Sequence, residues 1–187
     1  MSDLASNASR AASEIAQATA AVDPAAFDRL VTALANARRI ALTGAGREGL
    51  MMRALAMRLY HLGLDAHVVG EMTCPPLGPG DLLFASAGPG DLSTITALVD
   101  TANRAGADTV CLTAQPEGPT SRAAGAIFHL PAQTMASDRG AGVSTILPMG
   151  SVFEGAMFLV FELVVLALRD RIGADSEAMR SRHTNLE

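Results

Sequence analysis

The sequence predicts an α/β protein, a three-layer sandwich in which a mostly parallel sheet lies between two layers of helices. Short apolar segments alternate with segments of helical periodicity, which is the pattern of repeated strand–helix units. The apolar segments show no alternation with polar residues, so we expect helices to cover both faces of the sheet. Two of these segments lead directly into glycine-rich loops, which is where such sheets bind ligands.

Each element has its own local signal. Residues 4–20 are rich in alanine and favour a helix. Asp23 followed by Pro24 is an N-cap that opens a second helix, which runs to about Ala37. The predicted strands are 39–43, 66–69, 81–86, 109–113 and 126–130. The predicted helices between them are 48–62, which ends at Gly63, and 91–105, which ends at Gly106.

The C-terminal third combines a polar loop with a very apolar helix. The loop covers 131–142, the helix covers 151–171, and Gly173 ends it before a short polar helix and tail. The longest apolar run is interrupted by Glu162 and is too short to cross a bilayer. We expect Glu162 to pair with an arginine across a subunit contact. We divide the chain into an N-terminal helical extension, 1–30, and one domain, 31–187.

Composition excludes several classes of protein. A net charge of −5 and an aromatic content of 4% without tryptophan argue against a nucleic-acid partner. All 14 basic residues are arginine, so there is no lysine for a Schiff base or a Walker A loop. Cys74 and Cys111 lack C-x-x-C spacing, and no histidine pair has metal-site spacing. Because the N-terminus lacks a secretory pattern, we expect a cytoplasmic protein. We also expect no metal, no cofactor and no membrane partner.

The first glycine loop, 43–49, fits G-x-G-x-x-G between a strand and a helix. The acidic residue that a dinucleotide site needs about 20 residues later is missing, because Val68, Val69 and Gly70 stand there. Three interpretations remain open: a sharp strand-to-helix turn, a small-molecule site and a nicotinamide site. The second loop, 86–94, has the same position after the third strand.

Four segments resemble a known family, with their order and spacing kept. They are GAGREGLMMRALAMRLYHLG at 44–63, VVGEMTCPPLGPGDLLFA at 68–85, PMGSVFEGA at 148–156 and RSRHTNLE at 180–187. Together they are similar to the 6-phospho-3-hexuloisomerases of the sugar isomerase (SIS) domain superfamily, from about Val31 to the C-terminus. The resemblance implies a five-stranded parallel sheet of flavodoxin-like type. It also implies aldose–ketose isomerisation of phosphorylated sugars without metal or cofactor, and assembly as a dimer of dimers.

Both glycine loops depart from the family pattern. Where the family resembles GAGRSG, this chain has Glu48 in place of the serine. Where the family resembles SGSGET, the hydroxyl-bearing positions hold Ala87, Pro89 and Leu92, and Asp91 adds a carboxylate. In the family those hydroxyls and nearby helix amides hold the substrate phosphate. We therefore expect a weaker phosphate site, since like charges disfavour each other.

The two loops together supply the predicted substrate-binding residues. These are Gly44, Gly46, Arg47, Glu48, Ser86, Gly88, Gly90, Asp91, Ser93 and Thr94. The carboxylates suit sugar hydroxyl groups better than phosphate, so the substrate can differ from the family's. The alternative is that backbone amides, with the arginine and the hydroxyls of this set, still bind phosphate.

Isomerisation through an enediol needs a base for the carbon-bound proton and an acid/base group that opens the ring and shuttles the hydroxyl protons. A carboxylate and a histidine can supply both. Glu154 lies in the first turn of the apolar helix, where the helix dipole favours its ionised form. The resemblance makes Glu154 the base and places His183 in the active site of a neighbouring subunit. The alternatives are a capping role for Glu154 and a solvated tail histidine. His61 and Glu71 are secondary candidates.

Two functions of different classes follow. The leading one is a metal-free aldose–ketose isomerase of sugars or sugar phosphates. The alternative is a non-catalytic sugar- or sugar-phosphate-binding module that acts as a sensor. The apolar helix and the tail predict a homo-oligomer, most simply a tetramer.

Overall fold

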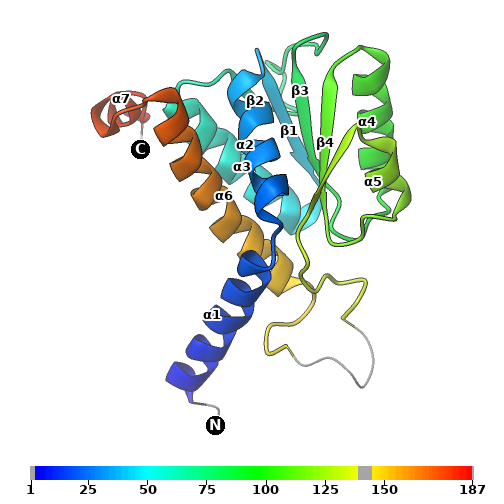
Figure 1. Cartoon of the computed structure of the whole chain (residues 1–187), viewed down its shortest axis with the longest axis vertical. Coiled ribbons are helices and arrows are strands. Elements are labelled where there is room, and N and C mark those ends of the chain that lie inside the picture. The colour runs from blue at the N-terminus through cyan, green and yellow to red at the C-terminus, as the bar shows by residue number, and fades with distance from the viewer. Residues whose placement is uncertain (1–2, 139–144, 187) are drawn as a thin grey trace.

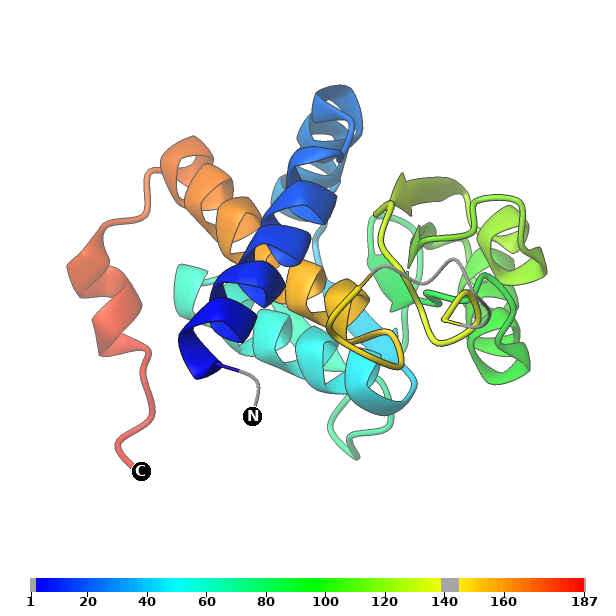
Figure 2. The ribbon, with the colours of Figure 1, turned by 90° about the horizontal axis from the view of Figure 1, so that it is seen from below.

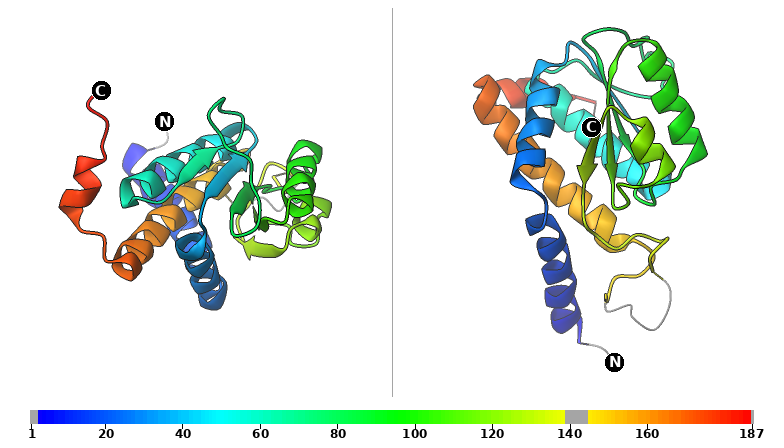
Figure 3. Two further views of the ribbon diagram at one scale, coloured as in Figure 1. Left: turned by 90° about the horizontal axis from the view of Figure 1, so that it is seen from above. Right: turned by 45° about the vertical axis from the view of Figure 1, so that its right-hand side comes forward.

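The computed structural model describes residues 3–138 and 145–186. Its centre is a five-stranded parallel sheet in the order β2-β1-β3-β4-β5, with helices on both faces (Figures 1 and 3). The strands are β1 (Ile40–Gly44), β2 (Ala66–Val68), β3 (Leu82–Ser86), β4 (Asp108–Thr113) and β5 (Ala126–His129). The helices are α1 (Leu4–Ala20), α2 (Pro24–Asn36), α3 (Gly46–Leu62), α4 (Ser93–Arg104), α5 (Pro119–Ala123), α6 (Ser151–Ile172) and α7 (Ser176–Ser181). The predicted fold class is confirmed.

The two faces of the sheet carry side chains of different size. Alternate residues of β1 and β3, among them Leu42 and Phe84, pack on the side of α2, α3 and α6. On the other face Ala41, Ala85 and Cys111 meet α4. Period-two alternation sends neighbouring residues to opposite faces. Both sets are buried, which is why the strands show no polar alternation.

The short helix α5 is a difference from the prediction, and so is the later start of α4. Thr120 connects α5 to the start of α4, because its Oγ1 accepts a hydrogen bond from the amide of Leu92 at 2.9 Å. Its own amide donates to the carbonyl of Gly90 at 3.0 Å. These bonds hold 90–92 against α5, with Leu92 extended as the N-cap residue, and α4 begins at Ser93. A five-residue helix is too short to show a periodic pattern.

The apolar helix α6 has 22 residues, so by length and composition it could cross a membrane. The expectation that the apolar segment is too short to cross a membrane is therefore wrong. Half of the apolar window is buried inside the chain, as in the core helix of an α/β protein. Glu162 pairs with an arginine as expected, but that arginine is Arg58 of the same chain, at 3.1 and 3.2 Å, and not one across a subunit contact.

The chain ends lie at opposite ends of α6. Helix α1 runs beyond the sheet and crosses the first turns of α6, where Ile15 packs against Gly155 (Figures 1 and 2). Helix α7 and the tail lie beside the other end of α6 (Figure 1). Part of the predicted polar loop, 139–142, lies outside the described residues.

Candidate functional site

The candidate site lies at the carboxyl ends of β1 and β3. Strand order reverses between these neighbours, since β2 lies on one side of β1 and β3 on the other. Such switch points leave a crevice for ligands. Gly44 and Ser86 are paired in register at this edge. Gly49 supports the turn, because a Cβ there would lie 2.5 Å from the carbonyl oxygen of Gly44.

A cavity of about 480 Å³ opens between these loops and the start of α6. It contains four of the predicted site residues: Gly46, Arg47, Glu48 and Glu154. The remaining lining residues are Ala45, Pro89, Leu92, Thr134, Met135, Met149 and Phe153. Its charged groups are thus one arginine and two carboxylates. A somewhat larger cavity of about 530 Å³ lies between α1 and residues 131–133, 145 and 152, and contains none of the predicted catalytic groups.

Glu48 is buried in the first turn of α3 and is 9% exposed. Its Oε2 accepts hydrogen bonds from the hydroxyl of Ser86 at 2.6 Å and from the amide of Gly88 at 2.9 Å. Burial raises the pKa of the Glu48 carboxyl group, and the two neutral donors partly offset that rise. The carboxylate of Glu48 therefore occupies donors that an external anion would otherwise use.

Arg47 connects α3 to the start of α6. Its Nη2 lies 3.1 Å from Oε2 of Glu154, and its Nη1 donates to the hydroxyl of Ser151 at 2.8 Å. It also donates to the carbonyl of Met149. Burial raises the pKa of Glu154, while the positive charge of Arg47 opposes that rise. The predicted base is thus mostly buried, with a cation that favours its ionised form.

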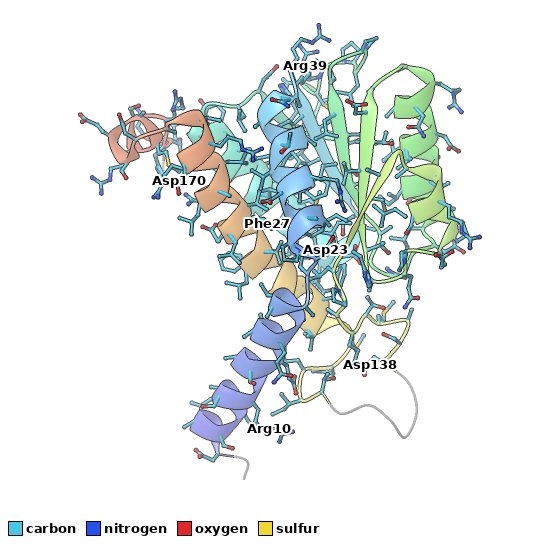
Figure 4. All side chains as sticks on the ribbon, viewed as in Figure 1. Arg10, Asp23, Phe27, Arg39, Asp138 and Asp170 are labelled. Carbon is cyan, nitrogen blue, oxygen red and sulfur yellow. The ribbon has the colours of Figure 1, made fainter. Side chains whose placement is uncertain are left out.

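Sequence reasoning missed the segment just before α6. Met149 has a φ of 54°, a strained value for a residue other than glycine, and it lines the cavity. Its amide donates to Asp138, which lies at the same end of the molecule as α1 (Figure 4). Glu14 of α1 accepts a hydrogen bond from the amide of Ile146 at 2.7 Å. The N-terminal extension therefore helps to hold one wall of the site, and no local pattern could have revealed a contact so distant in sequence.

The second glycine loop contributes less to the cavity than predicted. Gly90 turns away and packs against Gln115 and Gly118, where a Cβ would lie 2.6 Å from Cβ of Gln115. Asp91, Ser93 and Thr94 are exposed and do not line the cavity. Pro89 and Leu92 line it instead, so this wall is apolar.

The predicted histidine lies far from this cavity within one chain. His183 stacks on His61 with ring centroids 5.3 Å apart, at the C-terminal end of α3. Arg182 fixes the tail there, since it donates to the carbonyl of His61 at 3.2 Å. Glu71 lines a separate cavity of about 260 Å³ with Arg53 and His67. A single chain thus brings neither secondary candidate to Glu154.

Metal-binding potential was assessed from side-chain clusters. Within 3–138 and 145–186, no group of three or more histidine, cysteine, aspartate or glutamate side chains could hold a metal ion. Burial also raises the pKa of Cys111 to about 11, so this thiol stays protonated near neutral pH.

Comparison with known proteins agrees with this arrangement. Residues 33–158 match the SIS domain. A Mycobacterium gastri protein named 3-hexulose-6-phosphate isomerase is 37% identical over 185 residues, which cover 99% of this chain and 92% of that one. A Bacillus subtilis (strain 168) protein of the same name is 37% identical over 160 residues, 86% of each chain.

A solved structure gives the same picture. It is a Methanococcus jannaschii protein, and its crystal structure led to the inference that it functions as a 3-hexulose-6-phosphate isomerase. It matches with a TM-score of 0.82 and 26% identity over 96% of this chain and 98% of that chain. The chain therefore belongs to the SIS domain family, among its 6-phospho-3-hexuloisomerase-like members.

Proposed function

We propose that the protein is a metal-free sugar isomerase that moves the carbonyl group of a hexulose or hexulose phosphate between adjacent carbons through an enediol. This narrows the predicted aldose–ketose reaction, because a 3-hexulose carries its carbonyl group at carbon 3 and one enediol step from there gives a 2-ketose. The observation that carries this proposal is the buried carboxylate of Glu154, held by Arg47 beside a cavity at the switch point of the sheet. Two relatives named 3-hexulose-6-phosphate isomerase support the reaction class.

Glu154 acts as the base in this proposal. It removes a proton from the carbon next to the carbonyl group and returns it to the neighbouring carbon. The ion pair with Arg47 and the N-terminus of α6 both stabilise the carboxylate form. The side chain of Glu154 is 17% exposed, which limits competition from water.

His183 opens the sugar ring from a second copy of the chain. The separation of His183 from Glu154 within one chain favours this arrangement over a site built by one chain. Exposed apolar side chains on α3 and α6, such as Leu50, Met57 and Phe158, offer surface for another copy. We expect a tetramer in solution, and light scattering that shows a monomer at micromolar concentration would contradict this expectation.

The substrate can lack the phosphate that the family binds. Glu48 already accepts the hydrogen bonds of Ser86 and Gly88. Arg47 is shared among Glu154, Ser151 and Met149. A phosphate dianion would therefore meet donors that Glu48 already occupies, the carboxylate of Glu154, and an arginine that is already engaged.

The test follows the carbon-bound proton by NMR in D₂O. Purified protein is incubated with 3-hexulose 6-phosphate and, separately, with the unphosphorylated 3-hexulose. We expect formation of the isomer with deuterium at the carbon that gains the proton. Binding of either sugar without isomer or deuterium would overturn the isomerase and support the sensor module.

A further inference from the structure

Two carboxylates face the same cavity from different helices. Glu48 comes from the first turn of α3, and Glu154 comes from the first turn of α6. Both line the cavity of about 480 Å³, and no other acidic side chain of the described residues does so. Enediol chemistry needs two kinds of proton transfer, one at carbon and one at oxygen. Two carboxyl groups in one cavity can divide that work.

The surroundings of the two groups differ in the way that such a division needs. Glu154 has a cation at 3.1 Å, the guanidinium of Arg47. Glu48 has only neutral partners, the hydroxyl of Ser86 and the amide of Gly88, and both donate to its Oε2. A cation favours the ionised form, while burial without a cation favours the protonated form. Environments that separate two carboxyl groups in this way mark one as the base and the other as the acid.

The remaining charges around Glu48 do not change this assignment. Burial raises the pKa of both Glu48 and Glu154, and a negative charge on Glu48 would raise the pKa of Glu154 further. Cys111 on β4 is the other titratable group coupled to Glu48, and its thiol is neutral near pH 7. Arg47 precedes Glu48 on α3 by one position, but its guanidinium contacts Glu154.

We propose that Glu48 is a second catalytic residue, which carries the proton between the two substrate oxygens while Glu154 carries the proton between the two carbons. This proposal rests on the proposed isomerase function. Oε1 of Glu48 makes no hydrogen bond to the described residues, which leaves it for a substrate oxygen.

The proposed step balances without any other reactant. Glu154 takes the proton from carbon, and the electrons of that C–H bond form the C=C bond of the enediol. The carbonyl oxygen receives the proton of the Glu48 carboxyl group. In the second half, Glu48 takes the proton of the other hydroxyl group as the new C=O bond forms, and Glu154 returns its proton to the former carbonyl carbon.

The first test is Glu48→Gln, which keeps the size of the side chain and removes its proton transfer. We expect kcat for open-chain 3-hexulose or its 6-phosphate to fall by about 10²–10⁴ while KM stays within a few-fold. Glu162→Gln is the matched control, because it makes the same change on α6, where the partner is Arg58. The control should keep the wild-type rate. A Glu48→Gln protein that is folded by circular dichroism and turns over within threefold of wild type would overturn the proposal.

The pH profile separates proton transfer from a structural role. The wild type should lose activity as pH rises and Glu48 loses its proton, which gives a basic limb in kcat. Glu48→Asp should keep that limb at a lower rate, whereas the residual activity of Glu48→Gln should lack it. If Glu48→Gln does not fold, the Glu48→Asp profile alone decides, and absence of the limb there would overturn the proposal.

A failure of this proposal can be told from a failure of the proposed function. If the wild type transfers no deuterium to either sugar, the isomerase itself is wrong. If the wild type transfers deuterium and Glu48→Gln does so equally fast, only the role of Glu48 is wrong.

Discussion

The two ends of α6 differ in almost every physical respect. At the N-terminal end, Glu154 is mostly buried and ion-paired, and it faces a cavity. At the C-terminal end, the tail lies on the surface and the exposed His183 stacks on His61. At 1.5 Å per residue, about 27 Å of helix separates Glu154 from Ile172. Two predicted catalytic residues therefore lie in two regions that a single chain does not bring together.

This difference shows which part of the chemistry one chain can hold. The N-terminal end has a base, a second carboxyl group and a cation in one cavity. The C-terminal end has a tail fixed by Arg182, and its His183 does not line the cavity that contains Glu154. The carbon and oxygen proton transfers belong to one chain in our proposals, while ring opening depends on another copy.

The largest expected effect is at the N-terminal end. Glu154→Gln keeps the size of the side chain and removes the base, so turnover should fall by about 10²–10⁴. Melting should stay close to wild type, because Oε2 of Glu154 makes an ion pair with Arg47 but no hydrogen bond to the described residues, and Arg47 keeps its bonds to Ser151 and Met149. Steady-state kinetics and a thermal melt check both statements. A folded variant with near-normal turnover would move the base to another residue, with Glu48 of the same cavity the next candidate.

The C-terminal end should show a smaller loss that can be rescued in mixed oligomers. We expect His183→Gln to lower turnover of the ring-closed sugar by about 10², the lower part of the range for one acid/base group. Oligomers co-assembled from His183→Gln and Glu154→Gln chains should regain activity, because some sites then combine both intact residues. Lack of rescue would place His183 outside the partner's site.

The fold was readable from the sequence because its signals are local. Gly63 and the Asp23–Pro24 pair mark helix ends, and the apolar strands are contiguous. Only part of the site could be predicted from the sequence. Glu154 and Arg47 could be predicted, but Gly90 packs against Gln115, a contact that depends on the whole fold. The strained Met149 and the support from Glu14 could not be predicted, because both depend on tertiary hydrogen bonds.

The apolar wall of the cavity offers a way to change its selectivity. Pro89→Ser and Leu92→Thr together restore hydroxyl groups on this wall, and the first change also returns a backbone donor. Ala87 is left unchanged, because it is buried in the core and does not line the cavity. One bond to a charged group contributes about 1.5–3 kcal/mol. We expect a net gain of about tenfold in affinity for 3-hexulose 6-phosphate, since Glu48 still holds the amide of Gly88. Titration calorimetry with 3-hexulose 6-phosphate measures this gain in affinity, and the unphosphorylated 3-hexulose is the control.

A wild-type protein that turns over only the phosphorylated sugar, and does so efficiently, would contradict this interpretation of the loop. The phosphate would then be held by Arg47 and by backbone amides, despite the carboxylates. The double variant would in that case gain little, because the phosphate site would already be complete.

The smallest expected effect is midway along α6, where Arg58 and Glu162 pair at 3.1 and 3.2 Å. Their side chains are 32% and 36% exposed, so water screens the pair. Such pairs contribute about 0.2–1 kcal/mol. A double-mutant cycle of Arg58→Ala and Glu162→Ala should give a coupling within that range that shrinks in high salt, with turnover unchanged. A coupling well above 1 kcal/mol would contradict this expectation, and so would a loss of activity in either variant. Either result would mean that the middle of α6 belongs to the functional part of the helix. The contrast between its two ends would then be less sharp than the cavity indicates.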